Sequence, residues 1–254
     1  MEILWFGTLA VLLIGYFALE GFDIGLGMLL PVLGRTPAAR DRLVGAMGPF
    51  VLANEVWLVA LAGALFGAFP TLEGKVISGL YPLVVALLLS WILRDAGLWF
   101  RRRLGGAAWR SLWDWTVCLG SAGLALTWGM ALTAMLRGLP SGALFDPLGI
   151  AGGVVVVAAF AFHGWTFAAW RLPGEPAVGG RRRSSPALLG SACVAAAPAA
   201  VVVAASASPI LDHAAPAATL TVLSVIVLPC APIMVGAQLW IWRTFGRGTV
   251  PTFF

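Results

Sequence analysis

Two carboxylates, Glu20 and Asp23, lie in the middle of an apolar stretch that runs from about residue 4 to residue 33. A spacing of three residues places both acids on one face of a helix. An ionised acid in hydrocarbon costs about 3 kcal/mol or more, so such acids normally face a bundle interior, a partner or a water path. The residues therefore predict that this chain handles protons or cations inside a membrane.

A second polar pair, Asn54 and Glu55, follows in the next apolar stretch. At 1.5 Å per residue, Asp23 lies roughly 15 Å before the end of its stretch, and Glu55 lies roughly 9 Å into the next one. The two stretches are antiparallel neighbours, so we expect Glu20, Asp23, Asn54 and Glu55 to form one cluster whose acids exchange protons near neutral pH. The alternative is that each carboxylate only pairs with Arg94 or accepts a buried backbone N–H.

Other polar residues in the apolar stretches have simpler interpretations. Arg94 needs an acidic partner, and its neighbour Asp95 is equally well explained by that arginine. Asp114, between two tryptophans, is expected to cap and anchor a helix start. His163 could ligate at most one haem in the membrane, and a lone histidine in an apolar span is more often packed or hydrogen-bonded. No metal-ligand spacing occurs, so no metal site is expected on this chain.

Composition defines the class of protein. Hydrophobic residues make up 60% of the 254 residues and charged residues 11%, and the mean hydropathy is +0.94. These values predict an all-α integral membrane protein. The net charge of +5 does not indicate nucleic-acid binding, because the basic residues lie in short loops between apolar spans.

About seven stretches are long enough to cross a membrane, and we expect them to form a single transmembrane helical domain over residues 1–254. Their expected bounds are about 4–33, 49–69, 75–100, 113–136, 148–170, 187–206 and 217–242.

Basic residues alternate between the two sets of loops. Thirteen of the sixteen fall in one set of loops or tails: Arg35, Arg40, Arg42, Arg101, Arg102, Arg103, Arg110, Arg171, Arg181, Arg182, Arg183, Arg243 and Arg247. The opposite loops hold Lys75 and Arg137. Because positive loops stay in the cytoplasm, the N-terminus is expected outside and the C-terminus inside a bacterial cell membrane.

The motifs together resemble subunit II of the cytochrome bd quinol oxidases. The most specific block is Glu20-Gly21-Phe22-Asp23-Ile24-Gly25-Leu26-Gly27-Met28-Leu29, and the second is Asn54-Glu55-Val56-Trp57-Leu58. Shorter matches include Arg94, Trp113-Asp114-Trp115 and His163-Gly164. The likeness is strong over about residues 1–120.

The resemblance implies an oxidoreductase subunit that is not catalytic alone. Its partner, subunit I, would carry the b and d haems and the quinol site, and this chain would ligate none of them. Subunit II would be a scaffold that lends Glu20, Asp23, Asn54 and Glu55 to proton uptake from the cytoplasm, with Trp57, Arg94, Asp95, Asp114 and His163 as structural polar residues or neighbours of haem or quinone. The resemblance also allows a structural quinone, bound lipid and small accessory subunits.

The sequence departs from this family in three ways. The family has about nine helices in subunit II, against about seven here. Acids that are usual in the second and third spans are replaced by Leu52 and Trp99. An alternative function is therefore an assembly subunit of a related oxidoreductase that conducts no protons. A third candidate, a stand-alone proton-coupled transporter, lacks paired inverted halves in the sequence.

Overall fold

The computed structural model describes residues 1–139, 146–173 and 184–248, and every regular element in these ranges is a helix. Seven helical segments are long and apolar enough to cross a membrane, which confirms the predicted all-α membrane fold. They are α1 (Glu2–Leu33), α2 (Pro37–Ala68), α4 (Tyr81–Phe100), α5 (Ala107–Leu136), α6 (Pro147–Arg171), α7 (Ser185–Ala205) and the segment Ala217–Phe245.

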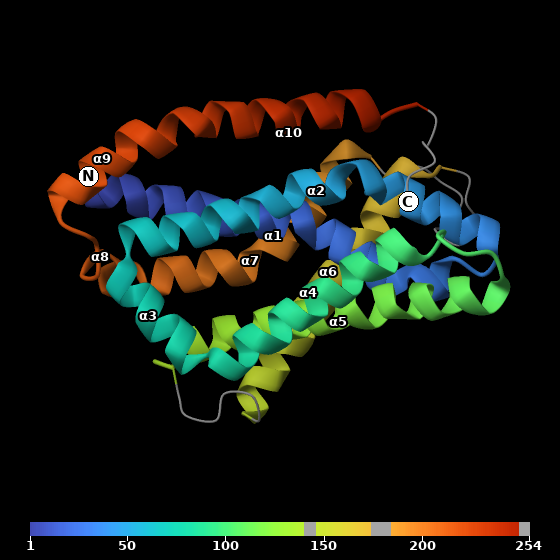
Figure 1. Ribbon diagram of the computed structural model, residues 1–254, viewed down its shortest axis with the longest axis horizontal. Coiled ribbons are helices and arrows are strands. Elements are labelled where there is room, and N and C mark those ends of the chain that lie inside the picture. Colours follow the sequence, from blue (N-terminus) through green and yellow to red (C-terminus); the bar gives the residue numbers. More distant parts are fainter. Residues whose placement is uncertain (140–145, 174–183, 249–254) are drawn as a thin grey trace.

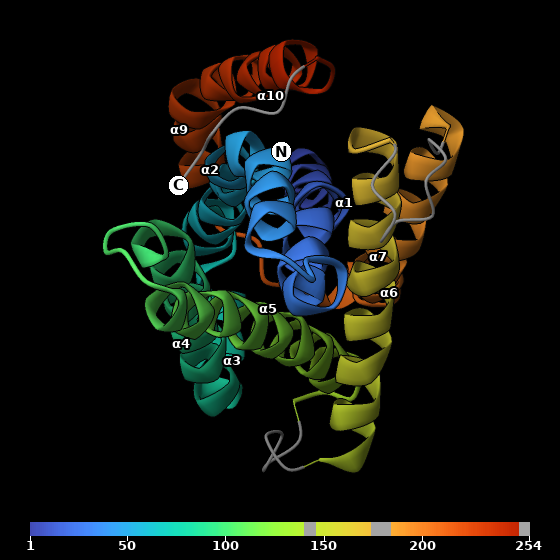
Figure 2. The same ribbon diagram turned by 90° about the vertical axis from the view of Figure 1, so that its right-hand side faces the viewer.

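Helix α1 lies at the centre of the bundle, in contact with α2, α5, α6 and α7 (Figure 1). Helix α4 packs along α5, while the last span lies apart on the outer side of α2 (Figure 2). This last span has only 6% of its most apolar window buried, whereas α5 has 67%. The two acids of α1 face the interior of this bundle and are fully buried, as an acid in a membrane span requires.

Glycines bring α1 and α6 into backbone contact. A Cβ atom on Gly25 would lie 1.8 Å from the carbonyl oxygen of Phe160, and one on Gly164 would lie 2.3 Å from the backbone nitrogen of Leu26. Small residues at such crossings let membrane helices approach closely. A similar crossing joins α5 to α4, where a Cβ on Gly120 would lie 2.6 Å from the backbone nitrogen of Arg94. These crossings hold the polar residues of α1 and α4 in place.

The second helix begins at Pro37, earlier than the expected residue 49. Thr36 caps it by accepting a hydrogen bond from the backbone nitrogen of Ala39, and Pro37 occupies the favoured first position. Polar residues in these first turns, including Arg40 and Asp41, lower the local hydropathy, so the sequence did not predict the start of the helix here. Asn54 and Glu55 consequently lie well inside a long helix rather than near its end.

Two other spans are interrupted by prolines. The expected span 75–100 is divided into α3 (Pro70–Gly79) and α4, which begins at Tyr81 with Pro82 in its first turn. The last span consists of α9 (Ala217–Val227), the 3₁₀ turn η3 (Leu228–Cys230) and α10 (Ala231–Phe245). Proline lacks the N–H that a continuous helix needs, and this explains both breaks. A short helix, α8 (Ala207–Leu211), precedes the last span.

Candidate functional site

Arg94 of α4 gathers three carboxylates around one guanidinium in the interior of the bundle. Its Nη1 atom lies 2.6 Å from Oε1 of Glu20, 3.3 Å from Oε1 of Glu55 and 3.6 Å from Oδ1 of Asp95. Arg94 and Glu20 are fully buried. Trp91, one turn before Asp95, donates its indole N–H to the same Glu55 oxygen at 3.1 Å. Helices α1, α2 and α4 thus meet at one cation.

Asp23 forms the second part of the site. The side-chain nitrogen of Asn54 donates to Oδ2 of Asp23 at 2.6 Å and to the backbone oxygen of Leu19 at 3.0 Å. We refer to Glu20, Asp23, Asn54, Glu55, Arg94 and Asp95 as the acid cluster. The structure therefore brings the four residues of the expected cluster together. It also gives Glu20, Glu55 and Asp95 the arginine partner that the alternative interpretation required.

The acid cluster holds more carboxyl groups than cations. Glu20, Glu55 and Asp95 contact the single guanidinium of Arg94, and the fourth carboxyl group, that of Asp23, is bound by Asn54 instead. A buried charge needs a partner, and one arginine cannot neutralise four ionised carboxylates. Oε2 of Glu20 and Oδ1 of Asp23 are buried without a hydrogen-bond partner among the described residues, so each is an oxygen that can take a proton. The arrangement is suited to binding and releasing protons.

Two further residues belong to this site. The side-chain amides of Gln238 on α10 and Asn54 on α2 are in hydrogen-bond contact at 2.8 Å. The indole N–H of Trp57 donates to the oxygen of Gln238 at 3.3 Å. The sequence points to Trp57 but not to its partner Gln238. The available signal was the type of residue, because Gln238 is the only glutamine of the chain and lies within an apolar span.

His163 has both ring nitrogens in hydrogen-bond contacts. Nδ1 lies 2.8 Å from Oγ of Ser191 on α7, and Nε2 lies 3.0 Å from the backbone oxygen of Ala18 on α1. Ligation of a haem iron would require the histidine to give up one of these contacts, so the residue does not fit an axial ligand. Within the described ranges, no group of three or more histidine, cysteine, aspartate or glutamate side chains could hold a metal ion.

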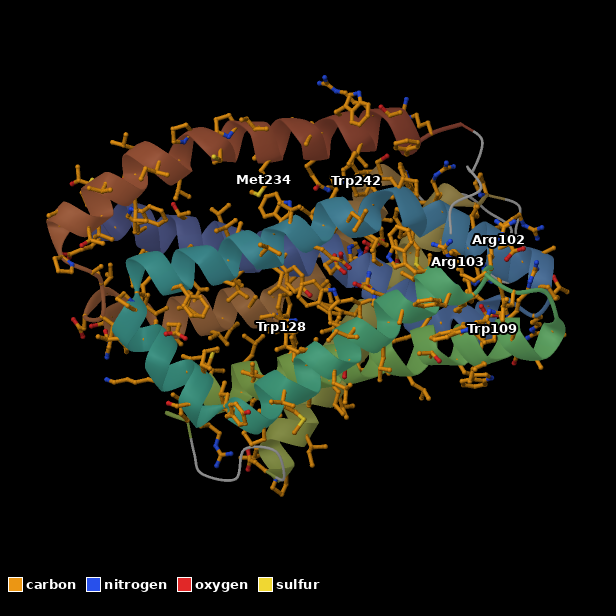
Figure 3. The ribbon with its side chains drawn as sticks, in the orientation of Figure 1. Arg102, Arg103, Trp109, Trp128, Met234 and Trp242 are labelled. Carbon is orange, nitrogen blue, oxygen red and sulfur yellow. The ribbon has the colours of Figure 1, made fainter. Side chains whose placement is uncertain are left out.

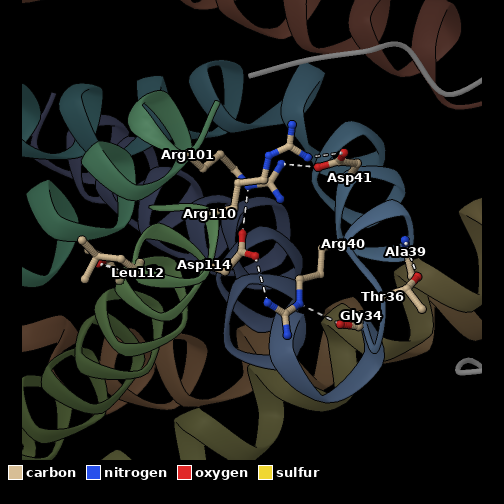
Figure 4. A network of polar contacts seen from close by, with 10 residues as sticks. Gly34, Thr36, Ala39, Arg40, Asp41, Arg101, Arg110, Leu112 and Asp114 are labelled. Atoms are coloured by element: carbon tan, nitrogen blue, oxygen red, sulfur yellow. Dashed lines mark hydrogen bonds and ion pairs between the residues drawn. The ribbon is translucent and has the colours of Figure 1, made fainter. Parts of the chain in front are cut away.

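Asp114 does not cap a helix, contrary to the interpretation from sequence. Helix α5 begins at Ala107, so Asp114 lies about two turns inside it. Its two oxygens accept hydrogen bonds from Arg40 at 3.0 Å and from Arg101 at 2.9 Å (Figure 4). Arg101 also reaches Asp41 at 2.8 Å. These contacts tie α2, α4 and α5 together and give the buried Arg101 its partners.

Basic residues collect at the end of the bundle that holds this network. Arg102 and Arg103 follow Arg101 at that end, beside Trp109 (Figure 3). Arg171, at the end of α6, donates to the backbone oxygen of Gly248 at 3.0 Å, and this contact joins α6 to the segment after α10. Arg181, Arg182 and Arg183 lie outside the described residues. The alternation of charged loops therefore corresponds to a basic end of the molecule.

The two residues that stand in place of the expected acids lie on the outer surface of the chain. Leu52, one turn before Glu55 on α2, is 54% exposed, and Trp99, one turn after Asp95 on α4, is 46% exposed. An acid at either position would therefore face out of this chain rather than into the acid cluster.

The fold and the site define a polytopic membrane protein that keeps a surplus of acids around one buried arginine. Residues 1–211 match the sequence model of the family "Cytochrome bd terminal oxidase subunit II". The chain belongs to this family.

Individual relatives agree with this assignment. The chain is 37% identical over 182 residues to the "Cytochrome bd ubiquinol oxidase subunit 2" of Bacillus subtilis (strain 168), which covers 68% of this chain and 54% of that protein. It is 32% identical over 189 residues to the "Cytochrome bd-I ubiquinol oxidase subunit 2" of Escherichia coli (strain K12), covering 69% of this chain and 50% of that protein. The chain thus spans about half the length of the curated relatives it matches.

Proposed function

We propose that this chain is the second subunit of a bd-type quinol:oxygen oxidoreductase. It scaffolds a subunit I that carries the b and d haems, and it lends residues to proton uptake from the cytoplasm. Reduction of one dioxygen to two waters takes four electrons, which two quinols supply, and four protons. The proposed task of this chain lies in the supply of those protons. The observation that carries the proposal is the acid cluster, because it lies in a chain that belongs to this family.

The exposure of two cluster acids supports the need for a partner. The side chain of Asp95 is 27% exposed and that of Glu55 is 11% exposed, although both residues lie inside membrane-spanning helices. Hydrocarbon cannot solvate a carboxylate, so a protein surface or a protein-lined water path must cover this side of α2 and α4. We assign that cover to subunit I.

Quinol oxidase activity is tested by purifying the complex through a tag on this chain. We expect a haem-bearing partner to co-purify, visible in the absorption spectrum, and we expect the complex to consume oxygen when quinol is added. This chain should ligate no haem, because His163 is already engaged on both nitrogens. A stable, colourless monomer would contradict the proposal and favour the transporter.

The proposed direction of proton uptake requires the basic end of the bundle to face the cytoplasm. We propose N-out and C-in topology, because positive loops are retained inside. In a cysteine-free variant, Ser184→Cys at the start of α7 should react with an impermeant maleimide only after the cells are opened. The matched position at the other end, Lys75→Cys on α3, should react in intact cells. Labelling of Ser184→Cys from outside would reverse the topology.

A second candidate function is supported by Leu52 and Trp99. The resemblance to the family implies an acid at each of these positions, and both residues are exposed on the surface of this chain. A subunit that had lost its part in proton delivery could retain the fold and still assemble subunit I. The two candidates differ in whether a cluster acid is needed for turnover.

A further inference from the structure

The only asparagine and the only glutamine of the chain are in contact with each other. Asn54 and Gln238 are separated by 184 residues in sequence, and their side-chain amides lie 2.8 Å apart. Asn54 is fully buried and Gln238 is 6% exposed. Gln238 lies on α10, beyond the residues 1–211 that match the family model. The last span is otherwise loosely covered, so this polar contact is its deepest connection to the acid cluster.

The neighbours of Asn54 fix the direction of its amide. Its nitrogen faces the backbone oxygen of Leu19 and the carboxylate of Asp23, which are both acceptors. The amide oxygen of Asn54 must therefore face Gln238, and Gln238 must present its NH₂ group to it. The oxygen of Gln238 is then left to accept from the indole of Trp57 at 3.3 Å.

The opposite orientation of Gln238 has its own partners. Turned by half a rotation, the amide would donate to the backbone oxygen of Ala53 at 3.2 Å and accept from the indole of Trp242 at 3.1 Å. However, its oxygen would then lie 2.8 Å from the oxygen of Asn54, and two acceptors repel at that distance. Trp242 itself packs against Phe50 with ring centroids 4.8 Å apart, between α10 and α2 (Figure 3).

We propose that Gln238 is a positioning residue for the acid cluster. By donating to the oxygen of Asn54, it adds a third contact to those that hold this amide with its nitrogen toward Asp23, so Asp23 keeps a hydrogen-bond donor while protons move among the carboxyl groups around it. These groups are Glu20 on the same helix, Glu55 on α2, and Asp95 with Arg94 on α4. The hydrogen bonds then all point the same way: Trp57 donates to Gln238, Gln238 donates to Asn54, and Asn54 donates to Asp23.

Infrared spectroscopy of the purified complex tests this direction without relying on oxygen reduction. The carboxyl band of Asp23 is identified by its loss in Asp23→Asn. We expect Gln238→Met, which keeps the side-chain length and removes both hydrogen bonds, to shift that band. The matched control is Leu239→Met on the exposed face of α10, which should leave the band in place. An unshifted band in Gln238→Met would overturn the proposal.

Two tryptophan variants test the orientation of the amide, and they also serve if Gln238→Met fails to assemble. Trp57→Phe removes the donor that supports the proposed orientation and should shift the Asp23 band. Trp242→Phe removes the donor of the opposite orientation and should leave it unchanged. If Trp242→Phe shifted the Asp23 band and Trp57→Phe did not, the proposal would be overturned.

The effect on turnover rests on the proposed function. Loss of the hydrogen bond to Asn54 should slow quinol-driven oxygen consumption about fivefold in Gln238→Met, at matched haem content. A shifted band with an unchanged rate would support the positioning role of Gln238 and contradict proton transfer through Asp23, so the two proposals fail separately.

Discussion

Replacement of Arg94 by methionine is expected to prevent stable assembly of the complex. Arg94 is fully buried, and it is the only cation in contact with Glu20, Glu55 and Asp95 among the described residues. Removing one partner of a buried ion pair costs about 3–5 kcal/mol, because it leaves the other charge uncompensated. That loss is a large part of the total stability of about 5–15 kcal/mol that a folded domain has.

Assembly is measured as the amount of complex recovered from membranes and its thermal midpoint in detergent. Arg103→Met, an exposed arginine near the start of α5, is the matched control and should assemble normally. The double variant Arg94→Met/Glu20→Gln should recover part of the loss, because the amide removes the carboxylate closest to the missing cation. Normal yield and stability of Arg94→Met alone would show that the ion pairs contribute little.

The sequence was sufficient to predict the centre of the site. Glu20 and Asp23 are separated by three residues, and Asn54 and Glu55 lie in the next span, so antiparallel packing of α1 and α2 places all four near one another. The need for an acidic partner for Arg94 followed from the expense of an isolated charge in a membrane. In each case, a buried polar group in an apolar helix has few ways to be satisfied.

The remaining contacts depend on tertiary packing. Asp114 meets Arg40, which is 74 residues away, because the long side chain of Arg40 reaches from the first turn of α2 to α5. Gln238 meets Asn54 across 184 residues because α10 lies on α2. Neither pair has a local signal that identifies its partner. The helix breaks at Pro82 and Pro229 did have a local signal, because proline interrupts the backbone hydrogen bonds. Mean hydropathy averages over such breaks and does not reveal them.

The outward position of Leu52 shows a similar limit. Leu52 is three residues before Glu55, and three residues turn a helix by about 300°, which leaves the two side chains roughly 60° apart. That angle is enough for Glu55 to reach Arg94 while Leu52 points away from the bundle. Periodicity places residues on a face, and the boundary of the buried face is set by the neighbouring helices.

Replacement of Glu20 by glutamine is expected to lower quinol-driven oxygen consumption about tenfold or more while the complex still assembles. Glutamine preserves the volume and can still accept a hydrogen bond from Arg94, but it cannot carry a proton, and loss of a proton-transferring group typically lowers a rate by about 10²–10⁴-fold. The effect should exceed that of Asp23→Asn, because Glu20 makes the 2.6 Å contact with Arg94, whereas Asp23 is bound by Asn54.

Turnover of Glu20→Gln is measured in purified complex at matched haem content. Glu2→Gln, an exposed acid at the start of the same helix, is the control and should retain the full rate. A rate of Glu20→Gln within about twofold of the unmodified complex, equivalent to about 0.4 kcal/mol in the barrier, would remove Glu20 from the proton path. The acid cluster would then act only to hold α1, α2 and α4 together, and the chain would be the assembly subunit of its complex.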